Sequence, residues 1–402
     1  MKTNSYLTDL KKQQGLLAEY LRSIDVAASD EELLNELIQK LPDYTGAHVV
    51  YEHDSSGNVI SAELHNFSEI PDYAFYNCAT LQTITFIDCP ITRIGKYAFY
   101  NCKNFRGFKI PEGVTEVGDY ALYQCEKWVA NVPTSIITIG KYAYAYTKIT
   151  SVTSIPNVQS IGANAFDWCS SLKTFVFPED HAVTLGTYLF RECGLTSVNL
   201  PDWMTSIPAH TFYCCRSLVL KDADLPTGVT SIGQGAFQAT RCQFNNLPEG
   251  LVSIGSSAFC GTPVTGTVVV PSTVTSIGVG AWVSTSPTTI HFKCPITGSY
   301  DFGDYLNSCR VTNLIFEADV TPTDIFEGIP SLTRVWFRKG VTKQYAKAVD
   351  STLYLWQKIK AGAVFYVEAA ASEIPEEWHA NWNKRSASST ITTQYGVTAQ
   401  PW

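Results

Sequence analysis

One short segment decides the fold of this chain: Ile94-Gly95-Lys96-Tyr97-Ala98-Phe99-Tyr100-Asn101-Cys102. The pattern returns at Ile161-Gly162-Ala163-Asn164-Ala165-Phe166-Asp167-Trp168-Cys169, and looser copies begin at Ile232, Ile254 and Ile277. A large apolar residue marks each copy, at Phe75, Phe99, Leu122, Tyr144, Phe166, Phe190, Phe212, Phe237, Phe259, Trp282, Leu306 and Phe326. These markers recur about every 23 residues, a period typical of proteins built from stacked coils.

Each period also contains two strand-like pieces. One ends near a proline, as in Leu172–Pro178 and Leu195–Pro201, and the other precedes the glycine, as in Val229–Gly233. We expect the glycine to let the backbone turn without a Cβ clash, and the marker to project inward, where burial is worth roughly 1.5–3 kcal/mol. Because one coil cannot bury its own apolar face, the pattern predicts a curved solenoid of stacked coils.

The recurring run Pro-x-x-Val-Thr-Ser-Ile-Gly-x-x-Ala-Phe-x-x-Cys resembles the BspA-like (Treponema-type) leucine-rich repeat over residues 64–337. The resemblance implies a β-rich, right-handed solenoid used for adhesion and protein recognition, without catalytic residues. We therefore expect a leucine-rich-repeat solenoid of about twelve coils at residues 59–338, each of about 23 residues. A helical N-terminal segment is expected at residues 1–58 and a helical cap and tail at 339–402. The stretch Trp336–Ile359 resembles the closing helix of such arrays, and Pro375–Asn383 resembles a tail of gut Firmicute members.

The N-terminal segment has a heptad-like seam, formed by Leu7, Leu10, Gln14, Leu17, Leu21 and Ile24. A second helix is predicted between the capping sequence at Ser29–Glu32 and Pro42. The segment, with its turn Val26–Ser29, is similar to N-terminal stretches of Firmicute phage tail-associated proteins. Two alternatives remain open: a helical cap on the first coil, or a homo-oligomer formed through residues 5–41.

Composition and charge exclude several classes of function. The net charge is −8 and no block of Lys or Arg is present, which argues against nucleic-acid binding. No stretch approaches the roughly 20 apolar residues that cross a bilayer, and no signal peptide is recognisable. We expect a soluble protein that is synthesised in the cytoplasm without membrane insertion and that acts at a cell surface or on a virion.

The twelve cysteines fit a repeat position better than a disulfide framework. Seven lie at or near one repeat position, which is Thr147, Thr240, Thr262 and Thr285 in other coils. Exchange with threonine favours free, buried thiols. The seven histidines are scattered, His291 is expected to face solvent from a strand, and no catalytic or phosphate-binding motif is present. The sequence thus predicts no metal, no cofactor and no enzymatic activity.

Tyrosines are concentrated in the first half of the array. Tyr73, Tyr97, Tyr120, Tyr142 and Tyr188 stand two places before a marker, whereas Tyr76, Tyr100, Tyr123, Tyr146, Trp168 and Tyr213 follow one or two places after it. Stacked coils would align these rings into rows, which either bind a partner or stabilise the edge of the solenoid. The later coils have Gly235, Ser257 and Gly280 instead. The candidate binding residues are Tyr73, Tyr76, Tyr97, Tyr100, Tyr120, Tyr123, Tyr146 and Trp168.

Three functions follow from these features. The first is a non-enzymatic recognition or adhesion protein that binds a surface protein or glycan. An alternative is a phage or prophage tail-associated receptor-binding protein that is attached through its N-terminal helices. The second alternative is a cytoplasmic protein-interaction scaffold, which fits free thiols but does not explain surface tyrosines.

Overall fold

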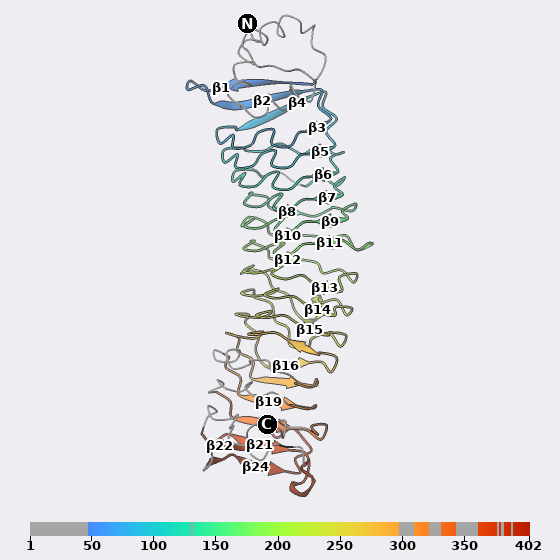
Figure 1. The fold of residues 1–402 in the computed structure, drawn as a ribbon, viewed down its shortest axis with the longest axis vertical. Helices are drawn as coiled ribbons and strands as arrows, with labels where there is room; N and C mark the ends of the chain where they lie inside the picture. Colours follow the sequence, from blue (N-terminus) through green and yellow to red (C-terminus); the bar gives the residue numbers. More distant parts are fainter. Residues whose placement is uncertain are drawn as a thin grey trace, which may run out of the picture. The chain divides into compact units, whose positions relative to one another are not determined.

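The structure is a computed structural model that describes residues 47–129, 132–296, 309–320, 331–342, 361–375, 378, 382–386 and 389–402. The chain divides into two compact units, the first comprising Met1–Pro178 with Val183–Leu189 and the second Glu179–Ala182 with Phe190–Trp402. Within each unit the coils follow one another in sequence order (Figure 1). Short parallel strands and tight turns make up these coils, so the predicted β-rich solenoid is confirmed.

The first unit begins with an antiparallel hairpin of β1 (His48–His53) and β2 (Val59–His65). Strand β4 (Thr83–Ile87) then pairs parallel with β2, with Ser61 opposite Thr83. The expectation of a helical segment is therefore wrong for residues 48–53, where adjacent Val49, Val50 and Tyr51 favour a strand. The helices expected within residues 5–41 lie outside the described residues.

Most of the first unit is organised by a parallel sheet of two-residue strands. Its strands are β3 (Glu69–Ile70), β5 (Arg93–Ile94), β6 (Glu116–Val117), β7 (Thr138–Ile139), β9 (Ser160–Ile161) and β11 (Thr184–Leu185). The second residue is buried in the first five of these strands, and the pairing stays in register from coil to coil. On another side of the coils, β8 (Ser151–Val152) pairs with β10 (Thr174–Phe175).

The second unit contains two further parallel sheets. One consists of β13 (Ser206–Ile207), β14 (Ser231–Ile232), β15 (Ser253–Ile254) and β17 (Ser276–Ile277). The other consists of β16 (Thr267–Val270), β18 (Thr289–Phe292), β19 (Asn313–Phe316), β20 (Arg334–Phe337), β21 (Val364–Val367) and β24 (Thr392–Tyr395). The remaining elements are β12 (Ser197–Val198), the antiparallel pair β22 (Lys384–Ser386) and β23 (Ser389–Thr390), and two 3-10 turns at Asp222–Asp224 and Ala371–Glu373.

Two expectations about the second unit are corrected. In the described part of residues 339–402 the sheet continues through β21 and β24, so a helical cap is wrong there; residues 343–360 lie outside the described residues. His291 does not project into open solvent, since its side chain is 17% exposed and its Nε2 lies 3.0 Å from a carboxylate oxygen of Glu317. The next two residues along the register, Ile315 and Trp336, are buried, so His291 lies beside a covered part of the sheet.

The core is the stack of marker residues that the repeat predicts. The ten described markers, from Phe75 to Trp282, are each at most 3% exposed. Successive rings stack, with centroids 5.3 Å apart for Phe75 and Phe99 and 5.2 Å apart for Tyr144 and Phe166. The markers Leu306 and Phe326 lie outside the described residues.

Where a short strand is followed by glycine, the glycine is required for a different reason from the one expected. A Cβ atom on Gly95 would lie 2.5 Å from the backbone nitrogen of Asp72, and one on Gly140 would lie 2.5 Å from that of Asp119. Neither glycine has a positive φ. The requirement is therefore the close approach of the preceding coil, and the turn itself does not need glycine.

The cysteine repeat position is buried in six of its seven cysteines and half-buried at Cys78, and all twelve thiols are free, as predicted. The Sγ of Cys102 donates to the carbonyl of Phe75 in the preceding coil at 3.0 Å, and Cys125 does the same to Phe99 at 3.2 Å. Thr147 fills the position differently, because its hydroxyl donates to the carbonyl of Tyr144 in its own coil at 2.7 Å. Both residue types are small and carry a side-chain donor that finds a backbone carbonyl inside the solenoid, which explains why they exchange at this position.

Candidate binding surface

The turn segment that contains each marker presents its flanking side chains to the surface. The backbone N–H groups of Ala98 and Tyr100 donate to the carbonyls of Gly95 and Tyr97, which forms two local turns. The alternate amides bond to the next coil, and that of Phe99 lies 2.7 Å from the carbonyl of Ala121. Phe99 is buried by this arrangement, whereas Tyr97 and Tyr100 are partly exposed on either side of it.

The position two places before each marker adopts the left-handed backbone conformation. It has φ between 53° and 69° at Tyr73, Tyr97, Tyr120, Tyr142, Asn164, Tyr188, His210, Gly235, Ser257 and Gly280. This region costs roughly 1–2 kcal/mol for ordinary residues and is favoured by Gly and Asn. The tyrosines thus hold an unfavourable backbone geometry that other coils achieve with less strained residues.

Nine aromatic side chains lie against one another in two rows, and we call them the aromatic strip: Tyr73, Tyr76, Tyr97, Tyr100, Tyr120, Tyr123, Tyr142, Tyr146 and Trp168. In the first row, Tyr97 stacks on Tyr73 at 5.0 Å and on Tyr120 at 4.9 Å, with interplanar angles of 5°. The rows also touch each other, as where the rings of Tyr97 and Tyr100 lie 5.6 Å apart. The result is one continuous aromatic surface.

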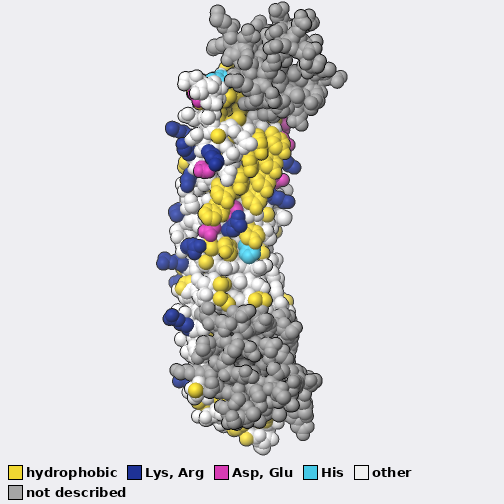
Figure 2. Space-filling model, turned by 60° about the vertical axis from the view of Figure 1, so that its left-hand side comes forward, with side chains coloured by type: hydrophobic (Ala, Val, Ile, Leu, Met, Phe, Trp, Pro, Cys, Tyr) yellow, Lys and Arg dark blue, Asp and Glu magenta, His cyan; other side chains and the backbone are white. Residues whose placement is uncertain are grey.

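The strip is accessible to a partner. Tyr73 and Trp168 are each 45% exposed and Tyr76 is 42% exposed, while the rings between them are half-buried by their neighbours. Figure 2 shows an uninterrupted area of hydrophobic side chains, a class that includes tyrosine, with Lys and Arg side chains alongside it. A contiguous apolar patch of this kind is uncommon on a surface that binds nothing.

All eight residues predicted from the sequence belong to the strip, and the structure adds Tyr142. Tyr142 stacks on Tyr120 at 4.8 Å, so it completes the first row. Asn164 occupies the next place in that row and interrupts it before Tyr188. Tyr213 packs edge-on against His210 at 5.7 Å, within the second unit. The 23-residue spacing had already pointed to Tyr142, which stands two places before its marker like the other members.

Three phenols of the strip favour the neutral, protonated form. Burial, followed by the neighbouring phenols and a nearby acid, raises the pKa of Tyr97 and of Tyr120 above its ordinary value of 10.0. Burial and adjacent phenols likewise raise the pKa of Tyr123. The hydroxyl groups therefore remain hydrogen-bond donors at physiological pH.

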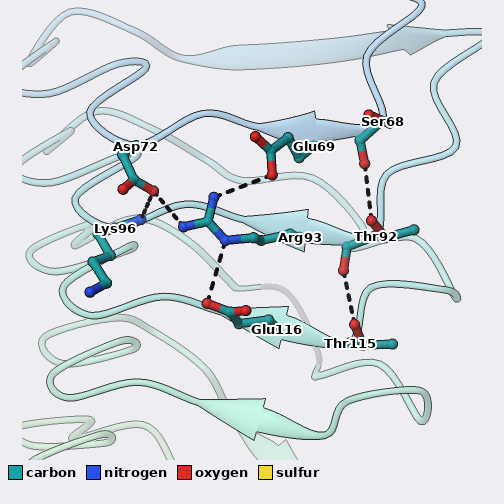
Figure 3. A network of polar contacts seen from close by, with 8 residues as sticks. All are labelled: Ser68, Glu69, Asp72, Thr92, Arg93, Lys96, Thr115 and Glu116. Carbon is teal, nitrogen blue, oxygen red and sulfur yellow. Dashed lines mark hydrogen bonds and ion pairs between the residues drawn. The ribbon is translucent and has the colours of Figure 1, made fainter.

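An ionic network fixes the backbone at the start of the first row. The guanidinium of Arg93 lies 3.3 Å from Glu69, 2.6 Å from Asp72 and 3.4 Å from Glu116, so one side chain joins three coils (Figure 3). Asp72 also accepts a hydrogen bond from the backbone N–H of Lys96 at 2.8 Å. These contacts hold the residues that immediately precede Tyr73 and Tyr97.

Other kinds of site are not found in the part of the chain that the structure describes. No group of three His, Cys, Asp or Glu side chains is placed there to hold a metal ion. Among the same residues, no helix has the length and apolar character needed to cross a membrane.

Three solved structures are similar to this chain. A leucine-rich repeat protein from Bacteroides ovatus is similar with a TM-score of 0.61 at 18% identity, over 88% of this chain and 100% of that chain. A leucine rich cell surface protein from Faecalibacterium prausnitzii gives a TM-score of 0.38 at 17% identity, over 75% and 91% of the two chains. The pneumococcal vaccine antigen PcpA gives 0.38 at 14% identity, over 86% and 82%. No curated protein matches the chain.

The family is shown by the repeat itself. A family profile described as BspA type leucine rich repeat region matches residues 68–183 and 159–289, which together are more than half of the chain. The ten described markers, and the glycines from Gly95 to Gly278 that approach the preceding coil, lie within this range. The chain belongs to the BspA type leucine-rich repeat family.

Proposed function

We propose that this protein is a non-enzymatic recognition or adhesion protein that binds a cell-surface protein or glycan through the aromatic strip. The observation that carries the proposal is the continuity of nine partly exposed rings over five successive coils. Tyrosine offers a large contact area at a low cost in side-chain entropy, and its hydroxyl tolerates water.

The later coils argue for a role in binding over a purely structural role. Gly235, Ser257 and Gly280 occupy the same left-handed position as the tyrosines, and the adjacent markers are equally buried. A coil therefore forms without an aromatic residue at this place. Since tyrosine is also strained there, its presence in four of the first coils favours a surface function.

Replacing rings with residues that other coils already use tests the proposal. The strip variant combines Tyr97→Asn and Tyr120→Asn, which introduce the residue type of Asn164, with Tyr100→Gln and Tyr123→Gln, which introduce that of Gln238. A control variant changes the same two turn positions outside the strip, with Ser257→Asn and Val283→Gln. We expect binding to cell-surface and glycan arrays to fall about tenfold or more in the strip variant, because central aromatic residues dominate interface energies.

The control variant should bind like the unchanged protein. Circular dichroism and the thermal unfolding midpoint report whether the strip variant is folded. Undiminished array binding by a folded strip variant would reject the strip as the recognition face.

The phage-tail alternative would use the same strip to read a host surface. It rests on the sequence of residues 1–46, which lie outside the described residues, and it stays a prediction. The scaffold alternative likewise stays a prediction, and the exposed rings give it no specific support.

A further inference from the structure

A hollow lies at the end of the aromatic strip, within the first unit. It has a volume of about 390 Å³ and is lined by side chains that include Lys103, Lys127, Lys148, Tyr146 and Trp168. Pockets of about 300–1,000 Å³ are typical of sites for small ligands, whereas a protein partner usually covers about 800 Å² of each surface. The hollow is thus suited to one or two monosaccharide units.

Two of the side chains that line the hollow are aromatic, Tyr146 and Trp168. The rings of Tyr146 and Trp168 are parallel to within 4°, with centroids 5.9 Å apart. Trp168 is 45% exposed, and Glu192 occupies its repeat position in the next coil, so the row of rings ends there. An exposed aromatic face carries partial negative charge and attracts the polarised C–H groups of a sugar ring.

Three of the other side chains that line the hollow are lysines. Lys103, Lys127 and Lys148 come from three successive coils, and Glu126 is the one acid that lines the hollow with them. Within the described residues, no carboxylate lies at ion-pair distance from these three ammonium groups, and Lys127 bonds to the side-chain oxygen of Asn104 at 2.6 Å. This local excess of positive charge contrasts with the net charge of −8 of the chain.

We propose that the hollow binds an acidic saccharide, in which a sugar ring stacks on Trp168 and a carboxylate or sulfate group contacts the lysines. The proposal rests on the proposed recognition function and narrows its ligand. The combination of an aromatic plane with unpaired cations distinguishes an acidic sugar from a neutral sugar, which does not use the lysines. It also distinguishes an acidic sugar from an acidic peptide, which does not need the tryptophan.

Calorimetry on the full chain with four defined probes tests the proposal: an oligogalacturonate hexamer, a heparin hexasaccharide, cellohexaose and hexaglutamate. We expect one or both acidic sugars to bind about tenfold or more tightly than cellohexaose and hexaglutamate, because only they satisfy both parts of the site. Heparin carries sulfate groups in addition to carboxylates, so binding of heparin alone assigns the anionic group to sulfate, whereas binding of oligogalacturonate shows that a carboxylate is sufficient. Binding of the acidic sugars should weaken when the NaCl concentration rises, since the lysines are exposed.

Two variants separate the contributions of the ring and the cations. Trp168→Asn removes the ring and keeps a residue that tolerates the left-handed backbone, as Asn77 and Asn101 do at the same repeat position. Lys103→Gln, Lys127→Gln and Lys148→Gln together remove the cations, and Lys109→Gln, Lys221→Gln and Lys339→Gln match this charge change elsewhere. Each site variant should weaken acidic-sugar binding about tenfold, and the control triple should leave it within about twofold.

Equal binding of cellohexaose, binding of hexaglutamate as tight as that of the acidic sugars, or no detectable binding of either acidic sugar would overturn the proposal. The test of this site can be separated from the test of the proposed function. If array binding is lost in the strip variant but retained in the lysine triple variant, the strip is supported as the recognition face and the acidic-saccharide site is rejected.

Discussion

The partly exposed tyrosines of the first row all have a left-handed backbone conformation. The spacing of the repeat located the rings, because a period of about 23 residues places equivalent residues above one another. It did not reveal their backbone geometry, since nothing in the chemistry of tyrosine indicates a positive φ. The sequence does contain an indication of the positive φ. Asn164, Gly235 and Gly280 stand at the same repeat position, and these residue types tolerate the left-handed region.

The stacked rings stabilise the turns as well as forming a surface. Tyr120 stacks on Tyr97 at 4.9 Å and on Tyr142 at 4.8 Å. We expect Tyr120→Asn to lower the free energy of unfolding by about 1–3 kcal/mol, because it removes two stacked aromatic pairs while asparagine suits the left-handed backbone. Urea denaturation measures the change. Ser257→Asn at the same position in a coil without strip rings should change stability by less than about 0.5 kcal/mol, and an equal loss in both variants would contradict this account.

The raised phenol pKa values predict sensitivity to alkaline pH. For Tyr97, Tyr120 and Tyr123 the folded state favours the neutral phenol, so its pKa is above the ordinary value of 10.0. The stabilisation is complete below pH 10 and is lost as the pH rises through the folded pKa. The thermal unfolding midpoint should therefore decrease as the pH rises above 10, and phenolate absorbance at about 295 nm should lag behind that of free tyrosine. A variant with Asn at Tyr97 and Tyr120 should show a shallower pH dependence, and an unchanged slope would argue against the strip as its source.

The short strand followed by glycine is the element on which the stacking of coils depends. Its position was predictable, because the Ile-Gly pair recurs with the marker. The reason for glycine was not, since the clash arises with a coil more than 20 residues away in the sequence. The β1–β2 hairpin and strands β21 and β24 also escaped prediction. They extend the sheets by backbone hydrogen bonds, which require no repeat motif.

A pair of glycines in one coil tests the close-approach requirement. A Cβ on Gly255 would lie 2.3 Å from the backbone nitrogen of Gln234, whereas the nearest atom to a Cβ on Gly250 is 3.8 Å away. We expect Gly255→Ala to destabilise the protein by about 2–3 kcal/mol, because the neighbouring backbone must shift. Gly250→Ala should be neutral or slightly stabilising, by up to about 1 kcal/mol, because it restricts the unfolded chain. Thermal or urea unfolding compares the two, and similar stabilities would contradict the requirement.

At the scale of the whole molecule, the repeat array supplies a uniform scaffold whose surface varies from coil to coil. The aromatic strip is confined to the first unit, in agreement with the polarity expected from the tyrosine distribution. The hollow was not predictable from the sequence. Its lysines belong to three different coils, and only the stacked structure shows that they line one space with Trp168.

The association state of the full chain remains a prediction from residues 5–41. The homo-oligomer alternative requires a mass in solution above the 44.4 kDa of one chain, measured by light scattering. Leu10→Glu with Leu17→Glu should then restore the mass of a single chain, because a charge in each apolar position prevents the seam from pairing. If the unchanged protein and the double variant both have the mass of one chain, the homo-oligomer alternative is rejected and the helical-cap alternative is favoured.

The alternation of hydrogen bonds in the turn segment has a mechanical consequence. The amides of Tyr97, Phe99 and Asn101 each bond to the next coil, so consecutive coils are tied by separate sets of contacts. Under tension these sets would rupture one coil at a time, because each coil contacts only its neighbours. A released coil of about 23 residues adds roughly 80 Å of extended chain. A protein of this construction would lengthen in steps while its remaining coils, and any ligand they hold, stay in place.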